Sequence, residues 1–184
     1  FDQIGPITNN VEDMAMIMEA MAGVDPKDAT SSKHQPQAYA SNLKLERKLK
    51  IAYYPQTLDN PKIDPEISKS MYALIDKLRA EGHTVEPQDL KYLDYLVPTY
   101  YVLTTAEASS NLSRFSGIHY GFRDKDAGDM ETVIKNSRSK GFGKEVQRRI
   151  MLGTFVLSSG YYDAYYSKAQ KVRRIIRADT NKTL

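Results

Sequence analysis

Two adjacent arginines, Arg148 and Arg149, are the side chains of this sequence best suited to bind an anion. They lie in the segment 141–177, where apolar residues recur at helical spacing, a pattern that indicates a helix with a buried stripe. A charge beside buried positions needs an ionic partner or an anionic ligand. Because a planar guanidinium group can bind a carboxylate through two hydrogen bonds, Arg149 is a candidate for binding the carboxylate of a ligand.

Tyr100 is the second candidate for a ligand contact. It follows Pro98 closely, at the start of an apolar segment that we expect to be helical. A phenol in that place can contact a ligand, or it can be a core tyrosine whose hydroxyl has a partner in the protein. The sequence leaves both alternatives open.

Other groups that could do chemistry lack partners at suitable spacing. The three histidines, His34, His83 and His119, are far apart and lie in different expected elements, so they predict neither a metal site nor a triad. The serines at 158–159 and 109–110 have no Lys or His nearby in the sequence. We expect these small residues, with Gly153 and Gly160 on one helix face, to let a neighbouring element approach.

The segment 141–177 must position Arg149. As one unbroken helix it would run about 50 Å, at about 1.5 Å per residue, and the apolar run 150–157 predicts a place in the interior of a sizeable protein. Within it, Tyr161/Tyr165 and Tyr162/Tyr166 are i, i+4 pairs that can stack along the helix. The segment 144–177 carries eight Lys or Arg against two acids, which predicts a solvated face or a phosphate contact.

The first half of the chain predicts one βαβ unit. A strand at 49–54, a helix that starts at Asp64-Pro65 and ends at Gly82, and a strand at 83–86 follow one another closely. Before them we expect an extended or turn-like segment at 1–8 and a polar surface connector at 25–48. Between these two we expect a helix capped by Asn10, whose methionine stripe we interpret as core rather than as a binding groove.

The second half is expected to be mainly helical. Helices are expected at 96–112 and 130–139, with a loop at 117–123, an exposed charged turn at 124–129 and a hinge at 141–143 before the long helix. No repeat and no further composition shift is present, so we expect a single partial domain over 1–184. Since the chain starts without Met and stops in a helix-like segment, we expect a piece of a longer protein.

Composition narrows the class of protein. The 184 residues include no cysteine, which rules out a disulfide framework, and the net charge of +3 is too small to identify a nucleic-acid binder. No apolar run approaches the length of a membrane span, so we expect no membrane partner.

Motifs in a fixed order along nearly the whole chain resemble a known family. DQIGPIT at 2–8, VED at 11–13 and GVDPKD at 23–28 resemble the amidase signature family just past its catalytic core. Further on stand PTYY at 98–101, AEASSNL at 106–112, YG at 120–121, GFGKEV at 141–146, RRIMLGT at 148–154 and SGYYDAYY at 159–166. These later motifs resemble, within that family, the glutaminase subunits of tRNA-dependent amidotransferases. The resemblance is weakest at 31–48, 56–63 and 88–95.

The resemblance implies an α/β fold, a mixed sheet covered by helices, of which this segment would be a mostly helical part with one βαβ unit. It implies a glutaminase whose Ser–cis-Ser–Lys triad forms an acyl-enzyme and releases ammonia, which converts misacylated Glu-tRNA(Gln) to Gln-tRNA(Gln). The implied partners are glutamine, tRNA(Gln) and the B and C subunits of a cytoplasmic heterotrimer. The whole complex would use ATP and Mg²⁺, neither of which this segment would bind itself.

The resemblance also assigns residues. The triad lies upstream of Phe1 in that family, so it implies no catalytic residue in this segment and no activity of the segment alone. The acid that holds the amino group of the substrate would lie beyond Leu184. Tyr100 matches the tyrosine of the Pro-Thr-Tyr motif, and Arg149 matches the arginine that binds the glutamine α-carboxylate, with Arg148 as the alternative if the register differs by one.

Two other functions stay open at this point. One is another amidase-signature hydrolase that acts on small amides. The other is a basic helical module that binds RNA through 168–177 and the tyrosines.

Overall fold

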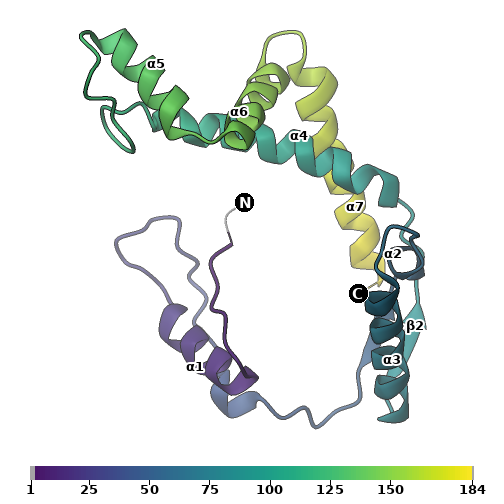
Figure 1. Ribbon diagram of the computed structural model, residues 1–184. Helices are drawn as coiled ribbons and strands as arrows, with labels where there is room; N and C mark the ends of the chain where they lie inside the picture. The colour runs from purple at the N-terminus through teal and green to yellow at the C-terminus, as the bar shows by residue number, and fades with distance from the viewer. Residues whose placement is uncertain (1–2, 184) are drawn as a thin grey trace. The chain divides into compact units, whose positions relative to one another are not determined.

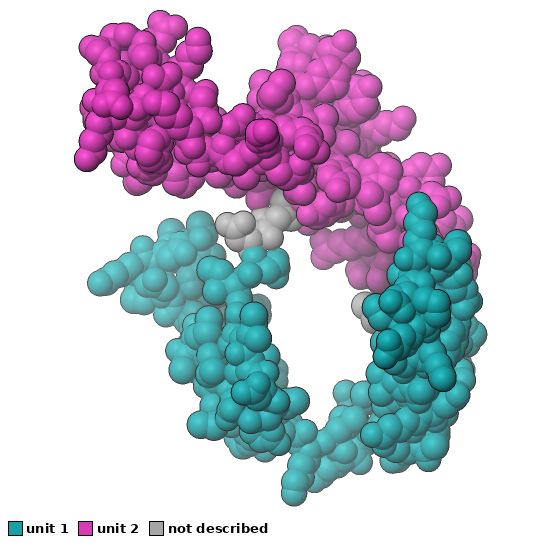
Figure 2. Space-filling model, viewed as in Figure 1, with its two compact units in different colours: residues 1–87 teal, residues 88–184 magenta. Residues whose placement is uncertain are grey.

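The structure, a computed structural model, describes residues 3–183 of the chain. It divides into two compact units, residues 1–87 and 88–184, each described here by itself (Figure 2). The expectation of a single partial domain stays a prediction, because it concerns the domain of the longer protein to which this segment would belong. Residues 3–8 form neither helix nor strand, and residues 1 and 2 lie outside the described part.

The first unit begins with α1 (Val11–Met21), as expected from its cap. The Asn10 side chain accepts a hydrogen bond from the Asp13 amide (2.7 Å) and donates one to the Asp13 carboxylate (2.9 Å). The methionine stripe is not a core here, however, and that expectation is wrong for this segment. Ala15 is buried, whereas Val11 and Met21 are more than half exposed. Helical spacing shows that one face is apolar but does not show which element covers it.

Residues 25–48 form the expected irregular connector, interrupted by a 3₁₀ turn, η1 (Ala40–Asn42). This turn is tied to α1 by a hydrogen bond of 2.7 Å from the Ala40 amide to the Glu19 carboxylate.

The βαβ prediction is confirmed. Strands β1 (Lys50–Tyr53) and β2 (Thr84–Pro87) pair in parallel, with Ile51 opposite Val85, and α3 (Pro65–Ala80) joins them (Figure 1). A short helix, α2 (Pro55–Leu58), precedes α3 and was not expected. Arg79 near the end of α3 donates to the Val85 carbonyl at 2.9 Å, which ties the helix to the sheet.

The second unit is built on α4 (Leu93–Asn111), against which α6 (Lys144–Leu157) and α7 (Lys168–Thr183) lie (Figure 1). Helix α4 starts three residues earlier than expected, so Pro98 is its sixth residue and lies beyond the first turn. The proline ring nitrogen has no hydrogen to donate to the Asp94 carbonyl, so α4 lacks one intrahelical hydrogen bond there.

The expected unbroken helix over 141–177 is wrong. Helix α6 ends at Leu157, and a π-helical turn, η3 (Tyr162–Ser167), precedes α7. The break falls at Ser158, which is extended, and at Gly160, whose φ of +86° a residue with a side chain rarely adopts. Gly160 therefore shares no helix face with Gly153.

The apolar side of α6 is also more exposed than expected. Met151 is 73% exposed, and Leu152 and Phe155 are exposed as well, whereas Val156 is buried. The predicted tyrosine pairs do form, with ring centroids 6.1 Å apart for Tyr161/Tyr165 and 5.1 Å for Tyr162/Tyr166. The Phe155 ring lies 4.3 Å from that of Tyr161.

Helix α5 (Met130–Gly141) holds the loop that follows α4 and its final 3₁₀ turn, η2 (Leu112–Arg114). Arg138 donates to the Leu112 carbonyl at 2.8 Å and to the Phe115 carbonyl at 3.1 Å. The turn at 124–129 is not fully exposed as expected, because Asp124 is 4% exposed. Its carboxylate binds the Lys140 ammonium at 3.0 Å and the Asn136 amide at 2.8 Å.

Candidate functional site

The two predicted ligand contacts, Tyr100 and Arg149, are 49 positions apart in the sequence and are brought together by the packing of α4 against α6. The guanidinium carbon of Arg149 lies 5.8 Å from the ring centroid of Tyr101. Tyr100, whose ring meets that of Tyr101 edge-on at 5.4 Å, is close enough to Arg149 to interact with it. The structure therefore places a phenol, an aromatic face and a guanidinium group in one cluster.

Glu145, one turn before Arg149 on α6, completes this cluster. Its Oε1 accepts a hydrogen bond from Arg149 Nε at 3.1 Å, and its Oε2 lies 3.1 Å from Arg148 Nη1. The pKa of the Arg149 guanidinium group is raised, first by the Glu145 carboxylate and then by the Tyr100 side chain. Both partners favour the charged form of Arg149, so it stays a cation at any pH at which the protein works.

The arginine pair is not buried in this segment, contrary to expectation. The Arg149 side chain is 36% exposed and that of Arg148 is 76% exposed. The reasoning that these charges need a partner holds, but the partner is an acid on the same helix at i−3 and i−4. Of the two, Arg149 is the one that faces α4, because it lies against Tyr101.

Glycine at position 153 sets the distance between the two helices. A Cβ atom there would collide with the Thr105 carbonyl and would lie 2.7 Å from Ser109 Cβ. One residue on, Thr154 Oγ1 is 2.9 Å from Ser109 Oγ. The Gly153 and Thr154 contacts both lie on the 105–109 turn of α4, so this close approach fixes the register that brings Arg149 to Tyr101.

The serines resemble packing and capping residues more than nucleophiles. Ser109 contacts α6 as described, and Ser158 donates to the Phe155 carbonyl at 2.7 Å, just beyond the end of α6. The expectation that small residues let α4 and α6 approach is confirmed for Ser109 and Gly153. The placement of 158–160 inside a helix was wrong, since these residues form the turn after it.

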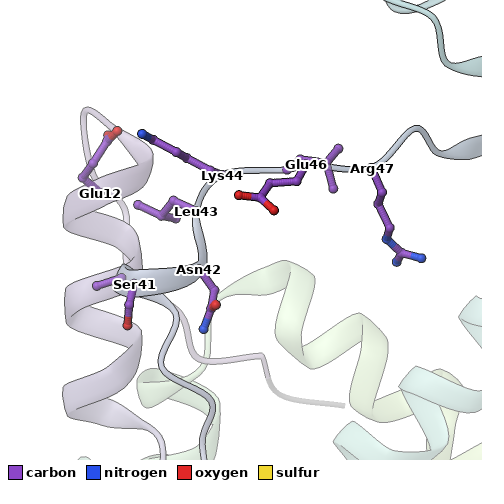
Figure 3. Close-up of a pocket in the computed structure, with 9 residues that line it drawn as sticks. Glu12, Ser41, Asn42, Leu43, Lys44, Glu46 and Arg47 are labelled. Carbon is purple, nitrogen blue, oxygen red and sulfur yellow. The ribbon is translucent and has the colours of Figure 1, made fainter.

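A hollow of about 920 Å³ lies in the other unit beside Glu12 and the segment 40–47 (Figure 3). Its side chains come mostly from the irregular connector, and it contains neither predicted ligand contact. Over residues 3–183, no group of three or more His, Cys, Asp or Glu could hold a metal ion, and no helix is long and apolar enough to cross a membrane.

Two members of the cluster were missed in the sequence. Glu145 stands three and four positions before the arginines, which is the spacing of helical ion pairs and could have identified it. Tyr101 had no comparable signal, because its contact with Arg149 depends on how α4 and α6 pack.

Comparison with known proteins identifies a family and relatives that match this segment. The Amidase family model matches residues 1–184. Proteins named as the A subunit of glutamyl-tRNA(Gln) amidotransferase are 48% identical over 182 residues in Staphylococcus saprophyticus and 46% identical over 183 residues in Campylobacter fetus. These alignments cover 98% and 100% of this chain, but only 37% and 40% of the two relatives.

A solved structure agrees with these relatives. The crystal structure of the A subunit of glutamyl-tRNA(Gln) amidotransferase from Thermotoga maritima matches with a TM-score of 0.64 and 34% identity. The match covers 99% of this chain and 34% of that one, so the chain spans between a third and two fifths of the length of the proteins it matches. The expected fold class, a mostly helical part of the amidase-signature fold with one parallel strand pair, is confirmed. On the family model, the relatives and the shared fold, this chain belongs to the Amidase family.

Proposed function

We propose that this chain is part of the glutaminase subunit of a tRNA-dependent amidotransferase. In this proposal the whole subunit hydrolyses the side-chain amide of glutamine, and the ammonia serves to convert Glu-tRNA(Gln) to Gln-tRNA(Gln). The names of relatives that are 46–48% identical over nearly all of this chain support the reaction. The convergence of Tyr100 and Arg149 on one cluster supports a substrate contact in this segment.

Arg149 would bind the α-carboxylate of glutamine. Glu145 bonds to Nε, so this bond does not use the edge formed by the two terminal nitrogens, which can bind a carboxylate with two parallel hydrogen bonds. The Tyr100 hydroxyl would donate a further hydrogen bond to the substrate. The two contacts would orient glutamine without taking part in bond breaking.

The nucleophile would come from another part of the glutaminase. In the family the acyl-enzyme forms on a serine of a Ser–cis-Ser–Lys triad, whereas the hydroxyls of Ser109 and Ser158 are engaged in packing and capping here. This segment would then bind and orient the substrate, and alone it would be inactive.

The remaining steps would belong to the complex. The B subunit would use ATP and Mg²⁺ to activate the glutamate on tRNA(Gln), the C subunit would brace the other two, and the heterotrimer would work in the cytoplasm. In this division of labour, the present segment contributes to the glutamine site and binds neither ATP nor Mg²⁺ itself.

The test compares two neighbouring arginines in the intact amidotransferase. Arg149→Ala should raise the KM for glutamine roughly 10- to 100-fold, because it removes a charge-assisted pair of hydrogen bonds. Amidation driven by added ammonia should keep its rate, since ammonia bypasses the glutamine site. Arg148→Ala is the matched variant, because Arg148 is the more exposed of the two and has the same acid as its partner.

The result can contradict the proposal in two ways. An unchanged KM in Arg149→Ala, with the effect appearing in Arg148→Ala, would move the carboxylate contact to Arg148. Hydrolysis of small amides without any amidation of Glu-tRNA(Gln) would identify a different amidase.

A further inference from the structure

Glu145 bridges the two arginines of α6 with both of its carboxylate oxygens. Oε1 accepts from Arg149 Nε, and Oε2 contacts Arg148 Nη1, each at 3.1 Å. Glu145 is the second residue of α6, where an acid also interacts favourably with the positive end of the helix dipole. An exposed acid four residues before an arginine is a common surface arrangement, so the pairing alone carries no function.

The choice of nitrogen distinguishes this pair. A guanidinium group has one edge that includes Nε and another formed by the two terminal nitrogens, and either edge can bind a carboxylate. Since Glu145 takes Nε of Arg149, it restrains the plane of the group without using the terminal edge. The Tyr101 ring, 5.8 Å from the guanidinium carbon, limits the movement of the same group on the side of α4.

We propose that Glu145 is a positioning residue, which holds Arg149 through Nε so that its terminal edge stays directed at a ligand carboxylate. This inference rests on the proposed function, because it needs Arg149 to bind the α-carboxylate of glutamine. Glu145 itself touches no substrate. Without it, the long and half-exposed Arg149 side chain would sample more rotamers and would lose entropy on binding.

The charge of Glu145 has the opposite effect on binding. A carboxylate beside Arg149 repels a second carboxylate, so removing the charge alone favours the ligand. Positioning by a hydrogen bond and repulsion by a charge can therefore be separated by substitution. In Glu145→Gln the amide oxygen can still accept from Arg149 Nε and the charge is gone, whereas Glu145→Ala removes both.

The experiment measures KM and kcat for glutamine in the intact amidotransferase. Glu145→Ala should raise the KM about three- to fivefold, the size expected for an exposed ion pair that orders a side chain. It should leave kcat and ammonia-driven amidation unchanged. Glu145→Gln should have a KM within about twofold of the wild-type value, or below it, because the hydrogen bond remains.

Glu131 provides the matched control for a purely structural role. It is likewise the second residue of its helix, α5, and is exposed, so Glu131→Ala removes the same helix-end charge away from Arg149. The KM of the Glu131→Ala variant for glutamine should equal that of the wild type. Ammonia-driven amidation and the thermal midpoint show whether each variant is folded.

Three results would overturn the inference. The first is an unchanged or lower KM in Glu145→Ala, the second an equal rise in Glu145→Gln, and the third a rise of the same size in Glu131→Ala. If Arg149→Ala also leaves the KM unchanged, the proposed function of Arg149 fails; if Arg149→Ala raises it and Glu145→Ala does not, only the role of Glu145 fails.

Discussion

The close approach of α4 and α6 makes Gly153 the most informative position to change. In Gly153→Ala the new Cβ would lie 2.7 Å from Ser109 Cβ and would collide with the Thr105 carbonyl. Ordinary contacts between carbon atoms are about 3.5–4.0 Å, so the helices would have to separate locally by roughly 1 Å. The obstacle is backbone, which cannot turn aside as a flexible side chain can.

Two opposing terms determine the size of the effect. Overpacking costs about 1–3 kcal/mol, and a collision with backbone belongs in the upper half of that range, about 2–3 kcal/mol. Replacing a glycine inside a helix by alanine recovers about 1 kcal/mol. The net loss is about 1–2 kcal/mol, which corresponds to roughly 5- to 30-fold in an opening equilibrium.

Amide hydrogen exchange in the intact protein is the direct measurement, because it reports local opening helix by helix. The amides of α4 and α6 in Gly153→Ala should exchange roughly 5- to 30-fold faster where exchange follows the local opening equilibrium. Under the proposed function the KM for glutamine should rise as well, since the same contact sets the position of Arg149 against Tyr101. Gly128→Ala is the control, because nothing lies within 4 Å of its added Cβ.

Slower exchange in Gly153→Ala would refute this reasoning. It would mean that helix propensity outweighs the collision, and that α4 and α6 are not in the close contact described.

Three further predictions concern the second unit. The pKa of the Asp124 carboxyl group is lowered, first by the hydrogen bond from Lys140 and then by that from Asn136. The Asp124 carboxylate therefore stabilises the fold above its unfolded pKa of about 3.9, and this stabilisation is lost as the pH falls through the lower folded pKa. Asp124→Asn should therefore flatten the acid-unfolding profile below about pH 4 in a circular-dichroism titration, and an acid limb as steep as that of the wild type would contradict it. Gly160→Ala should lower the thermal midpoint by an amount equivalent to about 1–2 kcal/mol, because its φ of +86° is costly for alanine although the space around it is open. Ser109→Ala should cost about 1 kcal/mol in denaturant unfolding through the hydrogen bond to Thr154 that it removes, and Ser113→Ala, whose hydroxyl bonds only within its own turn, should cost less.

Local features of the fold were predictable because their partners lie within a few residues. Asn10 caps α1 through the amide of Asp13, three positions on, and Asp64 caps α3 through the amide of Glu66 at 2.8 Å. The parallel pairing of β1 with β2 followed from the order of strand, helix and strand and from the short connections between them. Each of these inferences needed only spacing along the chain.

Burial was the least predictable property. The apolar stripes of α1 and α6 were expected in a core, yet Met21 and Met151 are exposed in this segment. Periodicity identifies an apolar face, but the element that covers it can be anywhere in the protein. The end of α6 was missed for a related reason, since Gly160 in a helical pattern can be either a tolerated interior residue or the left-handed residue of a turn.

The sequence by itself determined the βαβ unit, the caps of α1 and α3 and the family, and it identified Arg149 and Tyr100 as the residues to examine. Only the tertiary structure decided that the two meet and that Tyr101 lies against the guanidinium group. The physical reason is that their meeting depends on how closely α4 and α6 approach. That distance is set at Gly153 of α6, where a Cβ atom would collide with the backbone of α4.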